Sequence, residues 1–318
     1  MDCTILPKIS IVIPVKPGVE PTALLQIASL DWPLENLEVL IAEGTKPSRQ
    51  RNLAVQQARG DVVYFLDDDS LVLPDALKRL ARHFTDPKVA AVGGPSLTPD
   101  DNSLLQRAFG AVLSSPIGAG GVRNRYRRTG SVRETTEREL ILCNLAVRRE
   151  PFLTLGGLDE RLYPNEENEL LDRFIKSGWR LLHDPGLSVF RSQRQTLSAF
   201  AKQMFRYGRG RAEQTRIAGY SGIMPFVPLF FLFYLLSILF IKNNFWYIPL
   251  ALYIVAVVLS SILSAAEKKT PAILLLLPPL FPLLHVSNGI GLLVGFLFPL
   301  KRQSCYNHQP VTVRSLKP

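Results

Sequence analysis

Residues 62–70 read Val-Val-Tyr-Phe-Leu-Asp-Asp-Asp-Ser, so five apolar or aromatic residues run directly into three adjacent carboxylates. An apolar run of this length predicts a strand that is buried on both faces of a sheet. The carboxylates then lie at the carboxyl edge of that sheet, which is where α/β proteins bind their ligands.

Three neighbouring carboxylates repel one another, and two interpretations explain how the chain tolerates them. A divalent cation would offset the charge, since Mg²⁺ typically takes one or two carboxylates together with substrate phosphates. The alternative is an acidic turn that caps the next helix, because Asp69 and Ser70 suit an N-cap and Pro74 suits a first turn. Taken alone, the stretch leaves both interpretations open.

Charge and hydropathy divide the chain of 318 residues into two parts. Nearly all acids precede residue 217, whereas residues 222–300 are overwhelmingly apolar and contain Glu267 as their only acid. This contrast predicts a water-soluble domain followed by a membrane domain. The net charge of +10 is concentrated just before the hydrophobic part, which favours anionic lipid head groups over nucleic acid as the partner.

The three cysteines are odd in number and far apart, which indicates neither a disulfide framework nor a zinc site. A reduced, cytosolic location of the soluble part is the simplest inference. The amino terminus lacks a secretory signal pattern, because the apolar run 9–15 is too short and meets a proline.

Strand and helix patterns alternate through the first 190 residues, which predicts an α/β fold with a mostly parallel sheet and helices on both faces. The predicted strands are 9–14, 37–42, 62–66, 89–92, 140–147 and 180–183, and the predicted helices are 22–30, 48–59, 74–84 and one that ends near residue 177.

Residues 100–138 break this alternation, and we expect a mobile loop there. The segment contains Gly118-Ala119-Gly120-Gly121 followed by the arginines Arg123, Arg125, Arg127 and Arg128. These arginines form either a solvated basic surface or a contact with phosphate or lipid.

Residues 198–211 have the pattern of a basic amphipathic helix, and their position just before the apolar region predicts that the helix lies in the membrane interface. The resulting domain organisation is 1–197 for the soluble domain, 198–221 for the interface helix and linker, 222–300 for the membrane domain and 301–318 for a basic tail.

Three apolar stretches follow, at 224–241, 246–265 and 272–300. The first two approach the ~20 residues that a spanning helix needs. The third is interrupted by prolines and is either one kinked span or a re-entrant pair. Basic residues around 268–269 and in the tail favour two spans plus the re-entrant pair, although two, three or four crossings remain open. His285 is expected to be a hydrogen-bonded packing residue.

Several short motifs occur in a fixed order along residues 8–210. They are Ile11-Val12-Ile13-Pro14-Val15, Glu43, Arg51-Asn52, Phe65-Leu66-Asp67-Asp68-Asp69, Asn144-Leu145-Ala146-Val147-Arg148-Arg149, Gly156-Gly157-Leu158-Asp159-Glu160 and Glu166-Glu167-Asn168-Glu169-Leu170. This ordered set resembles the family-2 inverting glycosyltransferases with a GT-A-type fold. Length and the apolar carboxy-terminal part are similar to membrane-associated members that build bacterial surface polysaccharides or glycolipids.

The resemblance implies a site for a nucleotide-diphosphate sugar. The resemblance implies that the turn at Pro14, Val15 and Lys16, together with Glu43, would hold the base and ribose, and that Arg51 would lie near the base. The stretch that often reads Asp-Asp-Gly-Ser in the family is Glu-Gly-Thr-Lys at positions 43–46 here.

The acidic triplet corresponds to the family's D-x-D element, in which Asp67, Asp68 and Asp69 face the donor. The resemblance implies that Asp69 ligates Mg²⁺ or Mn²⁺ on the diphosphate. Asp67 would contact the ribose or a metal-bound water, and it is the second candidate ligand.

The family's Glu-Asp pair aligns with Glu166 and Glu167, so Glu167 takes the position of the general base. The base deprotonates the acceptor hydroxyl, which attacks the anomeric carbon opposite the leaving nucleotide diphosphate. Because the second residue is Glu here, one methylene longer than the usual Asp, the choice between Glu166 and Glu167 stays open.

Residues 203–207 read Gln-Met-Phe-Arg-Tyr and resemble the Q-x-x-R-W motif of processive synthases, with tyrosine in place of tryptophan. We assign Gln203 and Arg206 to the nucleotide-sugar site, with Arg206 reaching the diphosphate. Processive synthases usually carry spans on both sides of the catalytic domain, and the absence of an earlier span favours a single-addition transferase.

The sequence therefore predicts a metal-dependent, inverting glycosyltransferase, a hexosyltransferase by class, with its catalytic domain on the cytoplasmic side of a bacterial inner membrane. The acceptor is a membrane lipid or a lipid-linked saccharide. The alternatives are a processive polysaccharide synthase, a non-catalytic module that binds nucleotide sugars, and a nucleotidyltransferase.

Overall fold

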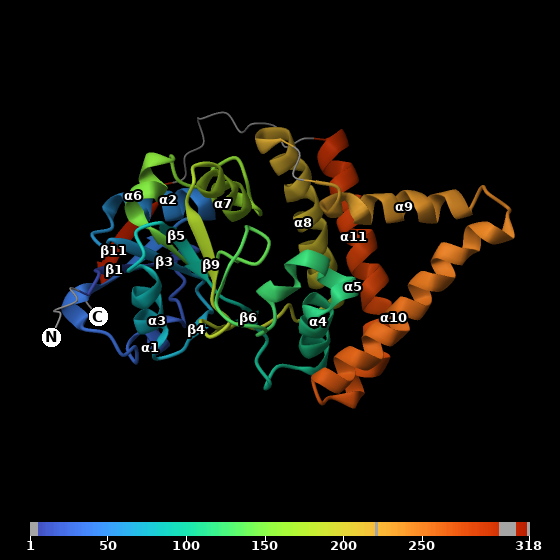
Figure 1. Cartoon of the computed structure of the whole chain (residues 1–318), viewed down its shortest axis with the longest axis horizontal. Helices are drawn as coiled ribbons and strands as arrows, with labels where there is room; N and C mark the ends of the chain where they lie inside the picture. The colour runs from blue at the N-terminus through green and yellow to red at the C-terminus, as the bar shows by residue number, and fades with distance from the viewer. Residues whose placement is uncertain (1–5, 220–221, 299–309, 317–318) are drawn as a thin grey trace. The chain divides into compact units, whose positions relative to one another are not determined.

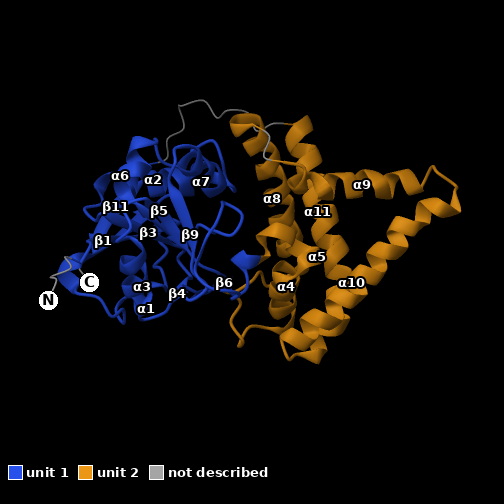
Figure 2. Cartoon of the chain, in the orientation of Figure 1, with its two compact units in different colours: residues 1–97, 124–191, 303–318 blue, residues 98–123, 192–302 orange. Residues whose placement is uncertain are grey.

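The computed structural model describes residues 6–219, 222–298 and 310–316 (Figure 1). The chain forms two compact units, which Figure 2 shows in different colours. The first unit comprises residues 1–97, 124–191 and 303–318, and the second comprises residues 98–123 and 192–302.

An eight-stranded sheet forms the centre of the first unit, in the order β11-β2-β1-β3-β8-β5-β9-β7. Its strands are β1 (Ile9–Val15), β2 (Leu37–Glu43), β3 (Val62–Leu66), β5 (Val89–Gly93), β7 (Arg133–Glu134), β8 (Asn144–Arg148), β9 (Arg180–His183) and β11 (Thr312–Leu316).

The sheet is mixed, which corrects the expectation of a mostly parallel sheet. β1 pairs in parallel with β2 and β3, and β5 pairs in parallel with β9. β8 runs antiparallel between β3 and β5, and β7 and β11 are antiparallel at the two edges. The long connection that precedes β8 allows it to enter from the opposite end, whereas a short crossover helix would have required a parallel strand.

Alternate residues of the central strands enter two separate cores, one on each face of the sheet. On one face, Ile11 and Tyr64 pack with α1 (Leu24–Ile27) and α3 (Ala76–His83). On the other face, Phe65 packs with the helices α2 (Pro47–Gln57), α6 (Arg149–Thr154) and α7 (Glu166–Lys176). All five residues of β3 are buried, as the apolar run predicts.

A second, three-stranded sheet has the order β4-β10-β6, with β4 (Leu71–Val72), β6 (Ser96–Leu97) and β10 (Val189–Phe190). β10 pairs antiparallel with β4 and parallel with β6. Because β4 directly follows the acidic triplet, this sheet fixes the end of β10 next to the carboxylates.

The expectation of a mobile loop over 100–138 is wrong. The segment contains α4 (Leu104–Ser114), α5 (Pro116–Ala119), the 3₁₀ helix η2 (Gly120–Arg125) and β7. α4 begins with a capping box in which Ser103 and Gln106 bond each other's backbone N–H. The ring of Phe109 in α4 stacks on Phe200 at a centroid distance of 4.2 Å, so tertiary packing as well as local sequence orders this helix.

The second unit is helical. Its longer helices are α4, α8 (Leu197–Ala218), α9 (Val227–Ile238), α10 (Ile248–Glu267) and α11 (Leu277–Leu297), and its short 3₁₀ helices are η3 (Met224–Phe226), η4 (Asn244–Tyr247) and η5 (Pro271–Leu275). The predicted helix 198–211 therefore continues to residue 218. α8 packs against α11 through glycines. A Cβ at Gly208 would lie 2.0 Å from the Asn288 carbonyl oxygen, and one at Gly291 would lie 2.0 Å from that of Phe205.

Among the described residues, two helices are long and apolar enough to cross a membrane, Asn244–Glu267 and Leu277–Leu297. The apolar helix Met224–Ile238 is shorter than a span requires. Residues 277–297 form one helix with Pro282 inside it. On α10 the buried side includes Ser260 and Ser261, whereas large apolar side chains such as Leu263 are exposed. This polarity is inverted relative to a helix of a water-soluble protein.

His285 has the packing role that the sequence predicts. Its Nδ1 lies 2.9 Å from the Tyr253 hydroxyl, and its Nε2 lies 2.9 Å from the carbonyl oxygen of Ile117. The imidazole thus links α11, α10 and α5 within the second unit.

Candidate active site

The carboxyl ends of β1 and β2 bring the predicted base and ribose contacts together. Val15 and Glu43 are register partners, so Pro14 and Val15 at the end of β1, and Lys16 at the start of the following turn, lie beside Glu43. The Gly18 N–H donates to Glu43 Oε1 at 3.3 Å, which fixes this turn against the carboxylate.

Arg51 joins two acidic segments that are far apart in the sequence. Its Nη2 donates to Asp67 Oδ1 at 2.9 Å, and its Nη1 lies 3.5 Å from Glu166 Oε1. The Arg51 side chain is only 5% exposed, so α2 holds a buried guanidinium group between the end of β3 and the start of α7. Three of the predicted site residues therefore form one cluster.

Arg191, which the sequence analysis did not select, contacts the acidic triplet from the other side. Its Nε donates to Asp69 Oδ1 at 2.7 Å, and its Nη2 lies 3.1 Å from Asp67 Oδ2. Burial opposes the charge of this guanidinium, but Asp67 and Asp69 hold its pKa well above the ordinary value. The residue follows a strand of two residues, which is too short to give a periodic signal.

The triplet itself is a tight turn and not a helix cap. The Asp67 N–H donates to Ser70 Oγ at 3.2 Å, and the Ser70 N–H donates to the Asp67 carbonyl at 3.1 Å. α3 starts only at Ala76, after a cap residue, Asp75, whose side chain makes no capping hydrogen bond. Burial, together with the neighbouring Asp69 and Asp67 carboxylates, raises the pKa of Asp68.

The two candidate bases lie in the first turn of α7, where the helix dipole favours negative charge. The Glu166 side chain is 3% exposed, and burial followed by the proximity of Glu167 raises its pKa to about 8 even though Arg51 opposes the shift. Glu167 Oε1 instead accepts a hydrogen bond from Arg125 Nη1 at 3.3 Å. The two neighbouring glutamates thus have different cationic partners.

Arg125 is the buried member of the arginine run at 123–128. Its Nε donates to the carbonyl of Arg138 at 2.9 Å, and its Nη2 donates to Asn168 Oδ1 and to the carbonyl of Glu137. Neither alternative offered for the run, a solvated surface or a phosphate or lipid contact, describes this residue, because its donors are used to hold α7. Sequence spacing gave no signal that separated it from its neighbours.

The arrangement so far is a sheet edge with three carboxylates, a pair of glutamates and three arginines that balance them. The model of the family described as "Glycosyl transferase family group 2" matches residues 62–266. The chain belongs to this family.

Two relatives are consistent with this membership. The chain is 28% identical over 223 residues to the succinoglycan biosynthesis protein ExoA of Rhizobium meliloti, covering 61% of this chain and 66% of the relative. It is 24% identical over 268 residues to the dolichyl N-acetyl-alpha-D-glucosaminyl phosphate 3-beta-D-2,3-diacetamido-2,3-dideoxy-beta-D-glucuronosyltransferase of Methanococcus voltae, covering 83% of this chain and 79% of the relative.

A solved structure with a similar fold is the mannosyltransferase PcManGT from Pyrobaculum calidifontis. It superimposes with a TM-score of 0.57 at 17% identity, covering 94% of this chain and 89% of that one. The likeness confirms the GT-A-type α/β class followed by a helical part. Family membership supports glycosyltransferase activity with a nucleotide sugar as the donor.

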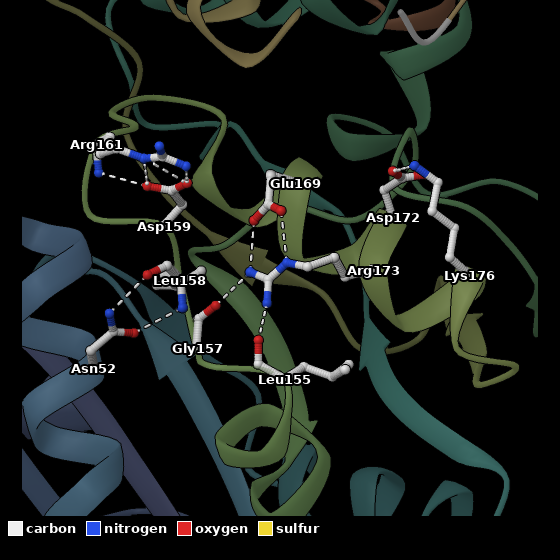
Figure 3. A network of polar contacts seen from close by, with 10 residues as sticks. All are labelled: Asn52, Leu155, Gly157, Leu158, Asp159, Arg161, Glu169, Asp172, Arg173 and Lys176. Atoms are coloured by element: carbon white, nitrogen blue, oxygen red, sulfur yellow. Dashed lines mark hydrogen bonds and ion pairs between the residues drawn. The ribbon is translucent and has the colours of Figure 1, made fainter. Parts of the chain in front are cut away.

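The glycosyltransferase motif at residues 156–160 has a structural role in this family member (Figure 3). Asn52 of α2 accepts from the Leu158 N–H at 2.9 Å and donates to the Leu158 carbonyl at 2.8 Å. Arg173 forms two hydrogen bonds of 2.7 Å to the Glu169 carboxylate and donates to the Gly157 carbonyl at 2.6 Å. The motif therefore fastens α7, and with it the two candidate bases, to α2.

Gln203 and Arg206 belong to α8 of the second unit, and their assignment to the donor site stays a prediction. Gln203 donates to the Tyr207 hydroxyl at 2.8 Å and accepts from Arg194 Nε at 3.0 Å. The Arg206 side chain is exposed.

The raised pKa of Glu166 predicts a pH dependence of stability. An ordinary glutamate has a pKa of 4.5, whereas folding raises that of Glu166 to about 8, so the folded state binds more protons between these values. Stability should consequently fall as the pH rises from about 5 to 8. We expect Glu166→Gln to flatten this slope and to unfold at a higher temperature than the wild type at pH 8, as measured by thermal unfolding in detergent.

Glu35→Gln is the matched control, because it neutralises an exposed carboxylate outside the cluster. It should leave the slope unchanged. An equally steep decline of the unfolding temperature in Glu166→Gln would show that Glu166 does not hold its proton in the folded state.

Proposed function

We propose that this protein transfers a sugar from a nucleotide-diphosphate sugar to a hydroxyl group of a membrane-associated acceptor, with inversion at the anomeric carbon. The observation that carries the proposal is the single cluster formed by the triplet after β3, Arg51 and the glutamates at the start of α7. The cluster provides a diphosphate subsite and a base subsite on the same sheet edge.

The nucleotide lies against the ends of β1 and β2 in this proposal. Pro14, Val15 and Lys16 form one wall and Glu43 contacts the ribose, which agrees with the hydrogen bond that fixes this turn. Asp68, the middle residue of the triplet, also contacts the nucleotide sugar in this proposal. Arg206 of α8 supplies a further guanidinium for the diphosphate, whose oxygens suit bidentate contacts.

Asp69 is the residue that fits a divalent cation best. Its Oδ2 has no hydrogen-bond or ion-pair partner among the described residues, whereas both oxygens of Asp67 already contact arginines. The described residues contain no group of three or more metal-ligating side chains. The unpartnered oxygen of Asp69 fits Mg²⁺ or Mn²⁺ held by one carboxylate and completed by donor phosphates. PcManGT was solved with GDP-Man and Mn²⁺, which supports the same metal class here.

When bound, the cation stabilises the charge that develops on the leaving diphosphate. The protein's own contribution is to orient Asp69 through Arg191 and to hold Asp67 between two arginines, where it contacts the ribose or metal-bound water. The metal contact of Asp67 is therefore indirect in this proposal.

Glu167 is the proposed general base. Glu166, with its pKa raised to about 8, holds a proton near neutral pH and cannot accept another. Glu167 takes the proton of the acceptor hydroxyl while the oxygen forms a bond to the anomeric carbon. The bond between that carbon and the diphosphate oxygen breaks, and the nucleoside diphosphate leaves on the opposite side.

The acceptor is proposed to be a membrane lipid or a lipid-linked saccharide that receives one sugar. The name of the Methanococcus voltae relative describes a dolichyl phosphate-linked acceptor. The two long apolar helices and the exposed apolar side of α10 support membrane association. The bases of α8 favour the cytoplasmic leaflet.

Transfer can be tested with membranes that contain the full chain, a panel of UDP- and GDP-sugars and lipid acceptors, by following nucleotide release and glycolipid mass. Wild type should release UDP or GDP only when Mg²⁺ or Mn²⁺ is present. Asp69→Asn should lower turnover by roughly 100-fold, the usual scale for losing one electrostatic contact in the transition state.

Asp75→Asn serves as the control for this variant, because Asp75 is a half-exposed aspartate that pairs with Arg79 outside the triplet. It should retain activity. Full activity of the wild type in EDTA, or of Asp69→Asn, would contradict the metal role.

Arg206→Lys tests whether α8 contributes to the donor site. A point charge replaces the planar fork, so turnover should fall several-fold while membrane association stays, because lysine and arginine each add ~1 kcal/mol near an anionic surface. Lys202→Arg on the same exposed side of α8 is the control. Near-normal kinetics of Arg206→Lys in detergent would leave α8 with an anchoring role only.

A further inference from the structure

Arg191 reaches the acidic triplet from a backbone that is held on two sides. The preceding residue, Phe190, is the register partner of Leu71, which follows Ser70 directly. The Arg191 N–H donates to the Leu97 carbonyl at 2.9 Å. The small sheet therefore presents the Arg191 guanidinium to the triplet as a rigid element.

The guanidinium uses two of its nitrogens to span Asp67 and Asp69. Nε takes one oxygen of Asp69 and Nη2 takes one oxygen of Asp67, so their carboxylates are held in a fixed relative orientation. Nη1 has no partner among the described residues, and the side chain is 27% exposed. A planar guanidinium group with one nitrogen that makes no other hydrogen bond is suited to bind a phosphate oxygen.

The local charges give this arrangement a measurable signature. Removing Arg191 leaves the aspartates more negative, so a bare divalent cation should bind more tightly, because less positive charge opposes it. A nucleoside diphosphate is an anion and should bind less tightly for the same reason. The two effects have opposite signs only if the guanidinium lies beside both ligands.

We propose that Arg191 is a positioning residue of the donor site, which holds Asp67 and Asp69 in place and directs a guanidinium nitrogen toward the donor diphosphate. The inference rests on the proposed donor site. It assigns the carboxyl end of β10, which the sequence motifs do not include, to recognition of the diphosphate.

The test uses the full chain in detergent and measures two affinities, that of Mn²⁺ alone by electron paramagnetic resonance and those of UDP and GDP at saturating Mn²⁺ by calorimetry. For Arg191→Gln we expect Mn²⁺ to bind several-fold more tightly and the better-bound nucleotide to bind about tenfold more weakly. Arg191→Lys keeps the charge but loses the fork, and its nucleotide affinity should lie between those of wild type and Arg191→Gln.

Arg180→Gln is the matched control, because Arg180 also bridges two carboxylates, those of Asp86 and Glu134. Arg180 is the first residue of β9 and does not contact the acidic triplet. It should leave both affinities unchanged. Tighter Mn²⁺ and tighter nucleotide binding in Arg191→Gln would show that Arg191 merely occupies the metal position, and unchanged affinities would show a structural ion pair. Either result overturns the inference, whereas a wild type that binds neither nucleotide overturns the proposed donor site itself.

A second inference comes from β11, which follows the apolar helices in the chain but belongs to the sheet of the first unit. Its residues Thr312 and Leu316 are register partners of Glu43 and Val39 in β2. Val313 and Leu316 pack against the cores on opposite faces of the sheet. Arg314 Nη2 lies 2.5 Å from Glu20 Oε1. Backbone, apolar and charged contacts therefore all hold β11 in the sheet of the first unit.

A strand cannot share a sheet with β2 across a bilayer, because its backbone hydrogen bonds connect it directly to its neighbour. We infer that residues 9–97, 124–191 and 312–316, which belong to the first unit, lie on the same side of the membrane and that the chain between residues 191 and 312 crosses an even number of times. This excludes the three-crossing arrangement that the hydropathy pattern leaves open. The two sufficiently long helices, 244–267 and 277–297, are the pair that would cross.

The test places single cysteines at the exposed positions Lys88 and Ser315, one at a time, in a full chain whose own cysteines are replaced. Each variant is labelled with a membrane-impermeant maleimide in inside-out and right-side-out vesicles. Both positions should be labelled from the same side. Labelling from opposite sides would overturn the inference, and retained nucleotide release by both variants is the control for correct folding.

Discussion

The site depends on the two guanidinium groups that flank Asp67. Arg51 and Arg191 approach one carboxylate from opposite sides, and each continues to a second acid, Glu166 in one case and Asp69 in the other. Like charges at a sheet edge would otherwise repel by several kcal/mol at the distances and dielectric of a protein surface. The alternation of charges therefore allows a dense acidic cluster to exist before any substrate arrives.

The exposure of the charged side chains increases along the cluster, from Arg51 and Glu166 to Asp69. The Arg51 and Glu166 side chains are 5% and 3% exposed, whereas that of Asp69 is 44% exposed. The inner end is consequently suited to fixing a protonation state, and the outer end is suited to exchanging ligands with solvent. The proposed roles follow this gradient, since Glu166 holds a proton and Asp69 meets the cation.

Two further arginines, Arg125 and Arg173, position the first turn of α7, which carries the proposed general base. Arg125 holds Glu167 and Asn168, and Arg173 holds the loop at residues 155–157 against Glu169. Because both arginines also bind backbone carbonyls, the first turn of α7 is fixed to two loops as well as to α2. A general base needs this precision, since proton transfer requires hydrogen-bond distance in the reactive complex.

The sequence by itself determined the features that depend on local pattern. The buried run before Asp67, the helix after Glu166, the basic helix before the apolar region and the family resemblance all follow from residues that are neighbours in the chain. Only the tertiary structure decided the direction of β8, the return of β11 to the sheet of the first unit and the partners of Arg51, Arg125 and Arg191. These depend on contacts between distant segments, and arginines look alike in a sequence until burial selects which of them meets a carboxylate. Strands as short as β10 carry too few residues for a periodic signal, so their place is set by the sheets they complete.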